Sequence, residues 1–359
     1  MPINLHSICI KPDSSIRQAI ACLDRSGRAT ALVVDEEFRL LDVITDGDVR
    51  RAILSGLSLD TPISLLKSRR DKSAYPEPVT APVGTDPSVL LRMMQERAVR
   101  QIPLLDPKGR VVNLVFLSDL LPEEVGPLQA VVMAGGYGTR MLPLTEQVPK
   151  PMLPVSDKPL LERIVQQLRE AGIKRVNVTT HYKAEVISQH FGDGRDFGVE
   201  IEYINEDQPL GTAGAIGFIS GTDEDPLLIM NGDIVTRMNF RAMMDFHRDH
   251  KADMTVAVRL YETTIPYGVL ETDGIEITGI AEKPVVRRFV SGGVYLLNKA
   301  MRQYIPKGQP FDMPDLIRTL IEHRHRVVSF PIHEYWVDIG RHADYEQAQK
   351  DVEHGGTTS

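Results

Sequence analysis

The sequence has little cysteine, little tryptophan and no excess of positive charge. Its 359 residues include two cysteines and one tryptophan, and 41 basic against 49 acidic residues give a net charge of −8. Cys9 and Cys22 form no Cys-x-x-Cys pair or zinc-type cluster, so we expect two small buried side chains in a reducing compartment. Without a broad basic surface we expect no nucleic acid partner, and any phosphate ligand must be bound at a local site.

Long apolar segments are also absent. The N-terminal stretch has no basic start followed by an apolar run, so we expect no signal peptide. No apolar stretch approaches the ~20 residues that a membrane span needs. The proportions of hydrophobic (42%) and charged (25%) residues are ordinary for a globular protein. We therefore expect a cytoplasmic protein with no membrane partner.

Two breaks divide the chain. Residues 121–128 (LPEEVGPL) combine two prolines, a glycine and two acids between apolar segments, which is typical of a linker. A weaker break falls at residues 68–78, where the chain is polar and charged. We expect one domain over residues 1–122 and a second over residues 127–350, and the chain is long enough for both.

The N-terminal domain contains an internal repeat. Its copies, at about residues 8–66 and 79–121, share the order of a capped helix, two apolar strands around a polar turn and a second helix. In the first copy the second strand ends at Thr45, and Asp48 follows three residues later. Such a repeat predicts an α+β domain made of two βαββα units packed together.

This repeat resembles a tandem CBS domain pair. In that family the hydroxyl residue and the aspartate after the second strand contact the ribose of a nucleotide, which implies an adenine nucleotide effector at Thr45 and Asp48. The second copy keeps Asp119 but has Phe116 at the hydroxyl position, where the ring either fills the pocket or stacks on a base. The alternative is a structural or dimerising module in which Thr45 and Asp48 form a helix cap. CBS pairs often self-associate, which implies a homodimer or tetramer.

Residues 129–350 follow a different pattern, in which β-rich apolar runs alternate with amphipathic helices. QAVVM, KRVNVTT, PLLIMN and TVAVRL predict strands, and PLLERIVQQLREAG has the apolar spacing of a helix that stops at Gly172. The alternation predicts an α/β domain with a doubly wound, mostly parallel, Rossmann-like sheet. Ligands of such a sheet bind beyond the carboxyl ends of its strands.

The most informative segment is a glycine-rich turn, AGGYGTR at residues 134–140, followed by VPKP. Glycines let backbone N–H groups approach a phosphate without interference from Cβ atoms. Two common phosphate motifs do not fit, because a dinucleotide fingerprint needs glycine or alanine at Met141 and a P-loop needs serine or threonine at Pro151. The cations Arg140 and Lys150 suit a triphosphate that is attacked at its α-phosphorus.

This segment strongly resembles the signature of the sugar nucleotidylyltransferases, and the resemblance continues to about Tyr345. That family transfers a nucleoside monophosphate from an NTP to a sugar 1-phosphate and releases pyrophosphate. The resemblance implies nucleotide contacts from Ala134, Gly135, Gly136, Gly138, Thr139, Gln208, Gly211 and Thr212. It implies sugar contacts from Tyr267, Gly268, Glu282 and Ser291. It implies Mg²⁺ as cofactor on Asp233 and Asp338, and Arg140, Lys150 and Lys283 as the catalytic cations.

The implied chemistry needs no general base. A phosphate monoester has a second pKa near ~6, so the attacking sugar phosphate is largely ionised at neutral pH. Mg²⁺ takes one or two protein carboxylates together with phosphate oxygens, which Asp233 and Asp338 would supply. Catalysis would then rest on positioning and on charge neutralisation.

The nucleotide and the sugar are implied by finer similarities. The loop QPLGTAGA is similar to that of guanylyl-transferring members, and Gln208 would read the base edge. Fusion to a CBS pair resembles the glucosamine-1-phosphate guanylyltransferases of legionaminic acid pathways, which implies GTP and glucosamine 1-phosphate as substrates. Mannose 1-phosphate is the alternative sugar, and UTP, CTP and dTTP are alternative donors.

Two other functional classes remain open. The first is a nucleotide sensor whose second domain binds without catalysis, which the presence of all the predicted cations and carboxylates argues against. The second is a cytidylyltransferase that acts on phosphocholine-like acceptors. The hydroxyl-reading residues Tyr267 and Glu282 favour a sugar over such an acceptor.

Overall fold

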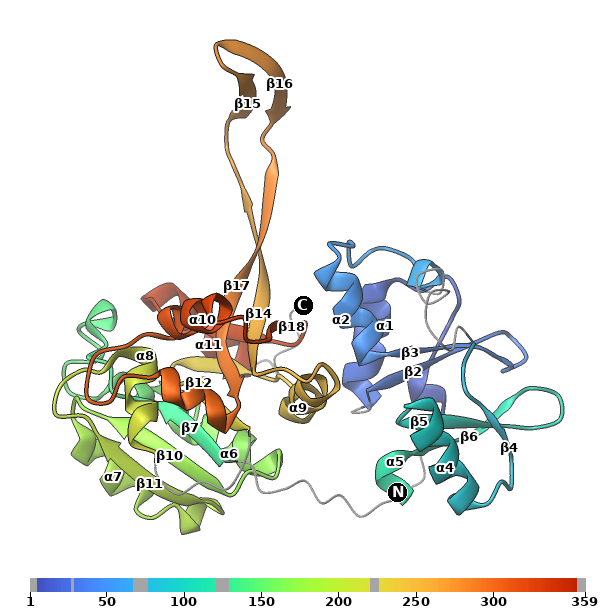
Figure 1. The fold of residues 1–359 in the computed structure, drawn as a ribbon, viewed down its shortest axis with the longest axis horizontal. Coiled ribbons are helices and arrows are strands. Elements are labelled where there is room, and N and C mark those ends of the chain that lie inside the picture. The colour runs from blue at the N-terminus through green and yellow to red at the C-terminus, as the bar shows by residue number, and fades with distance from the viewer. Residues whose placement is uncertain (1–4, 27–28, 67–76, 121–128, 220–225, 354–359) are drawn as a thin grey trace. The chain divides into compact units, whose positions relative to one another are not determined.

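The computed structural model describes residues 5–26, 29–66, 77–120, 129–219 and 226–353 (Figure 1). The chain forms two compact units that divide between Val125 and Gly126. The predicted linker at 121–128 and most of the weaker break at 68–78 lie outside the described residues. Over the described ranges, none of the helices has the length and apolar character that a membrane crossing requires.

The N-terminal unit contains the expected repeat of a βαββα motif. The first copy comprises β1 (Cys9–Ile10), α1 (Ile16–Ser26), β2 (Thr30–Val34), β3 (Leu40–Thr45) and α2 (Asp46–Leu54), after a short 3₁₀ helix at Leu5–Ile8. The second comprises β4 (Ala81–Pro82), α4 (Pro87–Arg97), β5 (Gln101–Leu105), β6 (Val111–Phe116) and α5 (Leu117–Leu120). Each copy forms a three-stranded sheet whose first pair is parallel and whose second pair is antiparallel.

An apolar layer shared by both copies holds this unit together. Leu32 and Val43 of the first copy pack in one cluster with Val111, Leu114 and Phe116 of the second. Burying a side chain of this size contributes roughly 1.5–3 kcal/mol. The ring of Phe116 is buried in this layer and fills space in the core, so both of its expected roles at a nucleotide pocket stay predictions.

The start of α2 is a reciprocal helix cap. The Thr45 hydroxyl accepts from the Asp48 N–H at 3.2 Å, and Asp48 Oδ2 accepts from the Thr45 N–H at 2.9 Å. Arg51 Nη2 donates to the other oxygen, Asp48 Oδ1, at 2.7 Å. These contacts satisfy backbone donors that the first helical turn leaves without partners. In the second copy Asp119 Oδ2 likewise accepts from the Phe116 N–H, at 2.9 Å.

The C-terminal unit is built on a seven-stranded sheet of order β11-β10-β7-β12-β17-β14-β18. Its strands are β7 (Gln129–Met133), β10 (Arg175–Thr180), β11 (Glu200–Asn205), β12 (Leu227–Asn231), β14 (Met254–Thr264), β17 (Val285–Leu297) and β18 (Val327–Pro331). Strands β11, β10, β7 and β12 are mutually parallel and β18 is parallel to β14, whereas β17 is antiparallel to both neighbours. The mostly parallel α/β sheet is therefore confirmed, and β17 is reversed because no helix crosses over between it and β14.

Amphipathic helices bury one face each in this unit. They are α6 (Leu160–Glu170), α7 (Ala184–Phe191), α9 (Phe240–Asp249), α10 (Met313–Glu322) and α11 (His342–Glu353), with a short α8 (Gly211–Gly214). One-turn 3₁₀ segments lie at Thr139–Met141, Lys150–Met152, Arg195–Phe197, Ala215–Phe218 and Lys299–Tyr304. The predicted helix α6 is followed by Gly172 at φ +90°, a conformation that glycine adopts without strain.

Four short strands form two small antiparallel pairs outside the seven-stranded sheet. Strands β8 (Pro154–Val155) and β9 (Lys158–Pro159) form a small hairpin, and β13 (Ile234–Thr236) pairs with β19 (Trp336–Asp338). The β13–β19 pair is antiparallel and sets Ile234 opposite Asp338. It therefore brings together two segments that lie about a hundred residues apart in the chain.

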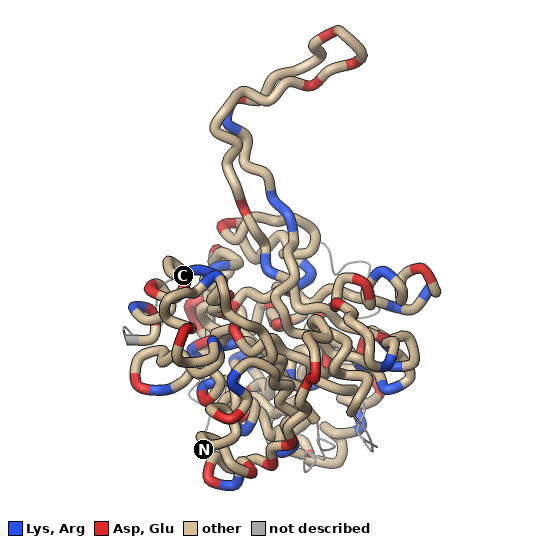
Figure 2. The backbone as a smooth tube through the Cα atoms, turned by 90° about the vertical axis from the view of Figure 1, so that its left-hand side faces the viewer, with Lys and Arg blue, Asp and Glu red and all other residues tan. Residues whose placement is uncertain are grey.

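A long two-stranded ribbon leaves the sheet. Beyond a register shift between Val256 and Val258, β14 and β17 continue to pair over residues 259–264 and 285–290. The ribbon then ends in the hairpin of β15 (Gly268–Asp273) and β16 (Glu276–Glu282). Figures 1 and 2 show from two directions that it projects far from the sheet that bears it.

The cap at α2 predicts the effect of removing one hydroxyl. Thr45→Ala removes the side-chain acceptor for the Asp48 N–H, and an N-cap of this kind is worth about 1 kcal/mol. Amide hydrogen exchange in the first turn of α2 should therefore become about fivefold faster. Thr45→Ser keeps the oxygen and should exchange at nearly the wild-type rate. Equal exchange in the Ala and Ser variants would contradict the capping role.

Candidate active site

A cavity of about 410 Å³ lies at the carboxyl ends of β7, β10 and β12, where a doubly wound sheet binds its ligands. The glycine-rich turn forms one side, and Lys150, Glu206 and residues 231–233 form others. A larger cavity of about 490 Å³, between α6, β13 and α9, contains none of the residues that the sequence singles out. The chemistry therefore belongs to the smaller cavity.

The glycine-rich turn depends on Gly138. Its φ is +66°, and a Cβ atom there would lie 2.9 Å from Thr145 Cγ2 and 3.2 Å from Lys150 Cβ. The Thr145 hydroxyl donates to the Gly138 carbonyl at 2.8 Å and fixes the turn. Gly136, in contrast, has open space around its Cβ position and lines the cavity. The turn thus exposes backbone to a ligand at Gly136 and packs tightly at Gly138.

Glu206 is a cavity residue that the sequence does not single out. Its side chain is buried, Oε2 accepts from the Leu210 N–H at 2.9 Å, and a Cβ atom on Gly135 would lie 2.9 Å from Oε1. The carboxylate therefore holds the loop that follows β11 against the glycine-rich turn. In the sequence Glu206 is one of several polar residues in INEDQ, so nothing distinguishes it there.

A histidine links the same two loops. His181 Nδ1 lies 2.7 Å from the Glu206 carbonyl oxygen, and His181 Nε2 lies 2.8 Å from the Tyr137 hydroxyl. Because a carbonyl oxygen only accepts, Nδ1 carries the proton and Nε2 accepts from Tyr137 when the imidazole is neutral. Tyr137 lines the cavity, so this chain of hydrogen bonds positions an aromatic ring at the ligand side.

Lys150 and Asp233 form an ion pair at the floor of the cavity. Lys150 Nζ lies 2.6 Å from Asp233 Oδ2, and the lysine side chain is almost completely buried. Gly232 makes the close approach possible, since its N–H donates to the Met133 carbonyl at 2.8 Å and a Cβ atom would lie 2.7 Å from that oxygen. The pair thus joins the segment after the glycine-rich turn to the end of β12.

The two predicted metal ligands lie close together. The Asp233 carbonyl accepts from the Ile339 N–H at 2.9 Å, directly after β19, so Asp338 enters the same cluster. Among the described residues, Asp233 Oδ1 and Asn231 Oδ1 are buried without a hydrogen-bond partner. An unsatisfied buried carboxylate oxygen is costly unless a ligand completes its contacts. These oxygen donors fit a hard divalent cation.

The electrostatics of the cluster act on Asp338. Partial burial raises the pKa of its carboxyl above the ordinary value, and the nearby Asp233 carboxylate raises this pKa further. The cations Lys150 and Arg140 oppose the shift without cancelling it. A carboxyl with a raised pKa takes up a proton more readily than an ordinary aspartate, and a cation bound beside it would oppose this shift.

The remaining nucleotide-binding predictions divide into two groups. Ala134, Gly135, Thr139, Arg140, Gly211 and Thr212 line the cavity. Thr212 Oγ1 and N–H both contact Asp312 Oδ1, at 3.1 and 2.8 Å, so this hydroxyl is already engaged in holding the loop. Gln208 is exposed and does not line the cavity. Base reading by Gln208 stays a prediction that depends on a movement of its side chain.

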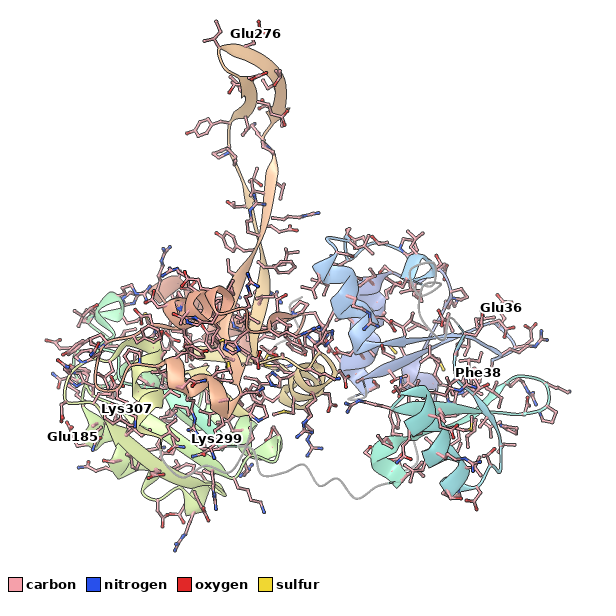
Figure 3. All side chains as sticks on the ribbon, viewed as in Figure 1. Glu36, Phe38, Glu185, Glu276, Lys299 and Lys307 are labelled. Carbon is pink, nitrogen blue, oxygen red and sulfur yellow. The ribbon has the colours of Figure 1, made fainter. Side chains whose placement is uncertain are left out.

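The sugar-binding predictions are separated in space. Ser291 lines a second cavity of about 310 Å³ that shares Thr212 and Asn231 with the first. Tyr267, Gly268, Glu282 and Lys283 instead lie on the projecting ribbon, and Tyr267 is 73% exposed. Figure 3 labels Glu276 at the tip of this ribbon, whose side chains point outward on both sides. The structure therefore does not bring these four residues to the cavity of their own chain, because β14 and β17 continue as a straight ladder.

Comparison with known proteins agrees with this geometry. Residues 129–355 match the family model of nucleotidyl transferases, and residues 4–55 and 74–126 match the model of the CBS domain. The chain belongs to the nucleotidyl transferase family. It carries a CBS domain pair before the catalytic fold. Members of the family generally use a divalent metal.

Two curated relatives are guanylyltransferases of sugar phosphates. The chain is 31% identical over 235 residues to a mannose-1-phosphate guanylyltransferase of Mycobacterium tuberculosis, covering 64% of this chain and 65% of the relative. It is 33% identical over 229 residues to the D-glycero-alpha-D-manno-heptose 1-phosphate guanylyltransferase of Aneurinibacillus thermoaerophilus, covering 63% of this chain and 99% of the relative. The chain thus spans just under two thirds of the mycobacterial protein and almost all of the second.

Solved structures share the fold of the C-terminal unit. HddC from Yersinia pseudotuberculosis, solved in complex with GMP-PN, superposes with a TM-score of 0.50 at 25% identity, over 63% of this chain and 99% of HddC. A glucose-1-phosphate thymidylyltransferase from Bacillus anthracis superposes with a TM-score of 0.52 at 22% identity, over 65% of this chain and 96% of that chain. The latter similarity concerns the fold alone.

The geometry of the glycine-rich turn predicts opposite outcomes for two glycines. Gly138→Ala forces an alanine into a left-handed conformation against Thr145 and should destabilise the ligand-free protein by about 1–3 kcal/mol. Gly136→Ala enters open space and should change stability by less than about 0.5 kcal/mol. Thermal unfolding of both ligand-free variants measures the difference. Equal unfolding temperatures would contradict the tight packing at Gly138.

Proposed function

We propose that this protein is a sugar-1-phosphate nucleotidylyltransferase. The reaction joins the nucleoside monophosphate of an NTP to a sugar 1-phosphate and releases pyrophosphate. The observation that carries the proposal is that the glycine-rich turn and the Lys150–Asp233 ion pair line one cavity beyond the strand ends, and that the Asp338 carboxylate lies beside Asp233 on the adjoining second cavity. Together they provide a phosphate cradle, a cation and an oxygen site for a metal.

The residues suit attack at the α-phosphorus of a triphosphate. An oxygen of the sugar phosphate forms a bond to that phosphorus, while the bond from the α-phosphorus to the bridging oxygen breaks and its electrons leave with pyrophosphate. Lys150 and Arg140 lie where they offset charge on the phosphates as it shifts toward the leaving group. The backbone around Gly136 holds the triphosphate in position, and no side chain needs to remove a proton.

Asp233 Oδ1 and the Asp338 carboxylate would hold the divalent metal, for which we propose Mg²⁺. Bound there, Mg²⁺ neutralises phosphate charge and fixes the orientation of the triphosphate. The buried Asp233 Oδ1 supports this assignment, since it is a carboxylate oxygen with no partner among the described residues. The raised pKa of Asp338 supports it as well, because the carboxylates of Asp233 and Asp338 repel each other less when a cation lies between them.

For the substrates we propose GTP and glucosamine 1-phosphate. GTP is supported by two relatives that are guanylyltransferases and by the solved complex of HddC with GMP-PN. Glucosamine 1-phosphate is supported by the fusion of the CBS pair to this catalytic fold. Mannose 1-phosphate is the alternative sugar because it is named for several relatives. We place the reaction in the cytoplasm.

For the CBS pair we propose an adenine nucleotide effector bound at Thr45 and Asp48. Asp48 Oδ1 contacts Arg51 at 2.7 Å, and the Arg51 side chain is 60% exposed whereas that of Asp48 is 7% exposed. A ribose hydroxyl would reach Asp48 by displacing the exposed Arg51 side chain. In the second copy Phe116 fills the core and Asp119 caps α5 without a hydroxyl partner. The first copy is thus the better nucleotide site.

The catalytic proposal is tested by measuring pyrophosphate release. GTP, UTP, CTP and dTTP are each combined with glucosamine 1-phosphate or mannose 1-phosphate in the presence of Mg²⁺. We expect turnover with GTP and glucosamine 1-phosphate, and a loss of at least about 100-fold in Lys150→Ala. Turnover with another pair would keep the reaction and change the substrates. No turnover with any pair, with or without AMP, ADP or ATP, would favour the non-catalytic sensor.

The raised pKa of Asp338 predicts how the rate depends on pH. As the pH falls, Asp338 takes up a proton earlier than an ordinary carboxyl, and the neutral acid binds a metal poorly. As the pH is lowered, the rate should therefore begin to fall at a higher pH than it would if Asp338 had the ordinary pKa of an aspartate. Asp344→Asn removes a carboxylate that raises this pKa, so it should keep activity and move the acid limb to lower pH.

Replacement of Asp338 itself separates activity from stability. The pKa of Asp338 is higher in the folded protein than in the unfolded chain. Protonated Asp338 therefore stabilises the folded state at low pH, and this stabilisation is lost as the pH rises through the folded-state pKa. Asp338→Asn stays neutral, so at pH 7 without metal it should unfold at the same temperature as wild type or higher. Its rate with Mg²⁺ should fall about 100-fold or more. A less stable Asn variant would contradict this account.

A further inference from the structure

The projecting ribbon exposes apolar side chains at its distal end. Ile275, Ile277 and Ile280 are 102%, 63% and 71% exposed, and Leu270 pairs with Ile280 across the hairpin. A two-stranded hairpin is at best marginally stable in water, and adjoining exposed apolar residues mark a contact surface. The hairpin therefore needs a surface that covers it.

The ribbon is continuous from the sheet to its tip. Pairing runs without a break over 259–264 and 285–290, and two hydrogen bonds cross the junction to the hairpin. They join the Ile265 N–H to the Pro284 carbonyl at 3.0 Å and the Lys283 N–H to the Tyr267 carbonyl at 3.3 Å. At roughly 3.3 Å per residue, this ladder carries the tip about 50 Å from the sheet. Its own cavity is out of reach unless these hydrogen bonds break.

The second cavity beside the nucleotide site has the complementary character. Trp336, Met313 and Pro314 give it an apolar wall, and Asp312 and Asp338 give it negative charge. No lysine or arginine is among the described residues that line it. A phosphate bound there would need a cation from elsewhere, since Lys150 is already paired with Asp233.

The ribbon carries both an apolar surface that would suit the wall of this cavity and a cation, which the described lining of the cavity lacks. Lys283 lies between β16 and β17, and on β17 Arg288 follows Arg287, which is itself paired with Glu262 at 2.7 Å. Figure 2 shows basic and acidic residues together along the lower part of the ribbon and acidic residues toward its tip. Cations and an apolar hairpin thus occur together on the segment that leaves its own domain.

We propose that the ribbon of one copy seats on the second cavity of another copy, reciprocally in a two-fold dimer. The apolar hairpin packs on the wall around Trp336, and the partner's Lys283 supplies the cation for the sugar phosphate. This inference rests on the proposed function for the identity of the phosphate. A two-fold arrangement buries both ribbons equally and closes the assembly. Each active site then contains residues of two chains.

Complementation between two inactive variants tests the exchange. Lys150→Ala damages the nucleotide cavity and keeps the ribbon intact, whereas Lys283→Ala damages the ribbon and keeps the cavity. Co-expression with two different affinity tags allows the mixed dimer to be purified. In that dimer one intact cavity meets one intact ribbon, so the specific activity should reach about half that of wild type.

A matched control uses two lesions in the same cavity. The mixed dimer of Lys150→Ala with Asp233→Asn has no intact cavity and should stay inactive. Activity of the Lys150→Ala and Lys283→Ala dimer that is no higher than this control would overturn the exchange, because a ribbon acting on its own chain gives no recovery. Full activity of Lys283→Ala alone would overturn the role of that lysine.

Crosslinking tests the ribbon without relying on catalysis. Ile280 is replaced by a photoreactive phenylalanine analogue in a tagged copy, which is mixed with an untagged copy and illuminated. We expect crosslinks between copies that map near Met313, Pro314 or Trp336. Crosslinks confined to one chain, or none, would overturn the docking. If wild type turns over no substrate pair but the crosslinks form, the proposed function fails while the ribbon contact stands.

Discussion

The candidate active site depends on one ion pair, between Lys150 and Asp233. The 2.6 Å contact joins segments 83 residues apart and fixes the glycine-rich turn to the end of β12. Removing one partner of a buried pair leaves an uncompensated charge and costs about 3–5 kcal/mol, so both residues also support the fold around them. The pair uses Oδ2 of the aspartate and leaves Oδ1 buried and unpaired, which creates the oxygen site that a metal needs.

The ion pair also determines what Asp338 does. Strand β19 lies against β13, so the second carboxylate comes next to a carboxylate that a lysine already holds in place. Two carboxylates and one lysine leave negative charge in a partly buried space, which is reflected in the raised pKa of Asp338. Arg140 offsets only part of this charge. The cluster is therefore arranged for a cation that arrives with the ligand.

Local patterns predicted most of the fold. Apolar spacing predicted α6 and its end at Gly172, and the glycines after β7 predicted a turn, which lines the cavity; its binding of phosphate stays a prediction. Glu206 escaped prediction because its role depends on the folded contact with Gly135, and its sequence neighbours are equally polar. The ribbon was not predicted, because TVAVRL indicates where a strand begins but not that this strand continues through solvent to Thr264. Whether a strand's apolar residues are buried depends on contacts that lie outside its own segment.

The charges of the cavity residues and of the phosphates that would bind there explain why the basic residues of the ribbon matter. Before any substrate binds, Lys150 is already paired with Asp233, and Arg140 offsets only part of the charge that Asp338 adds. A triphosphate and a sugar phosphate each bring further negative charge, and one divalent metal offsets only part of the total. Additional positive charge must come from a segment that is not yet at the cavity. Lys283 and Arg288 lie on such a segment, and if it comes from a second copy, assembly and catalysis become one event.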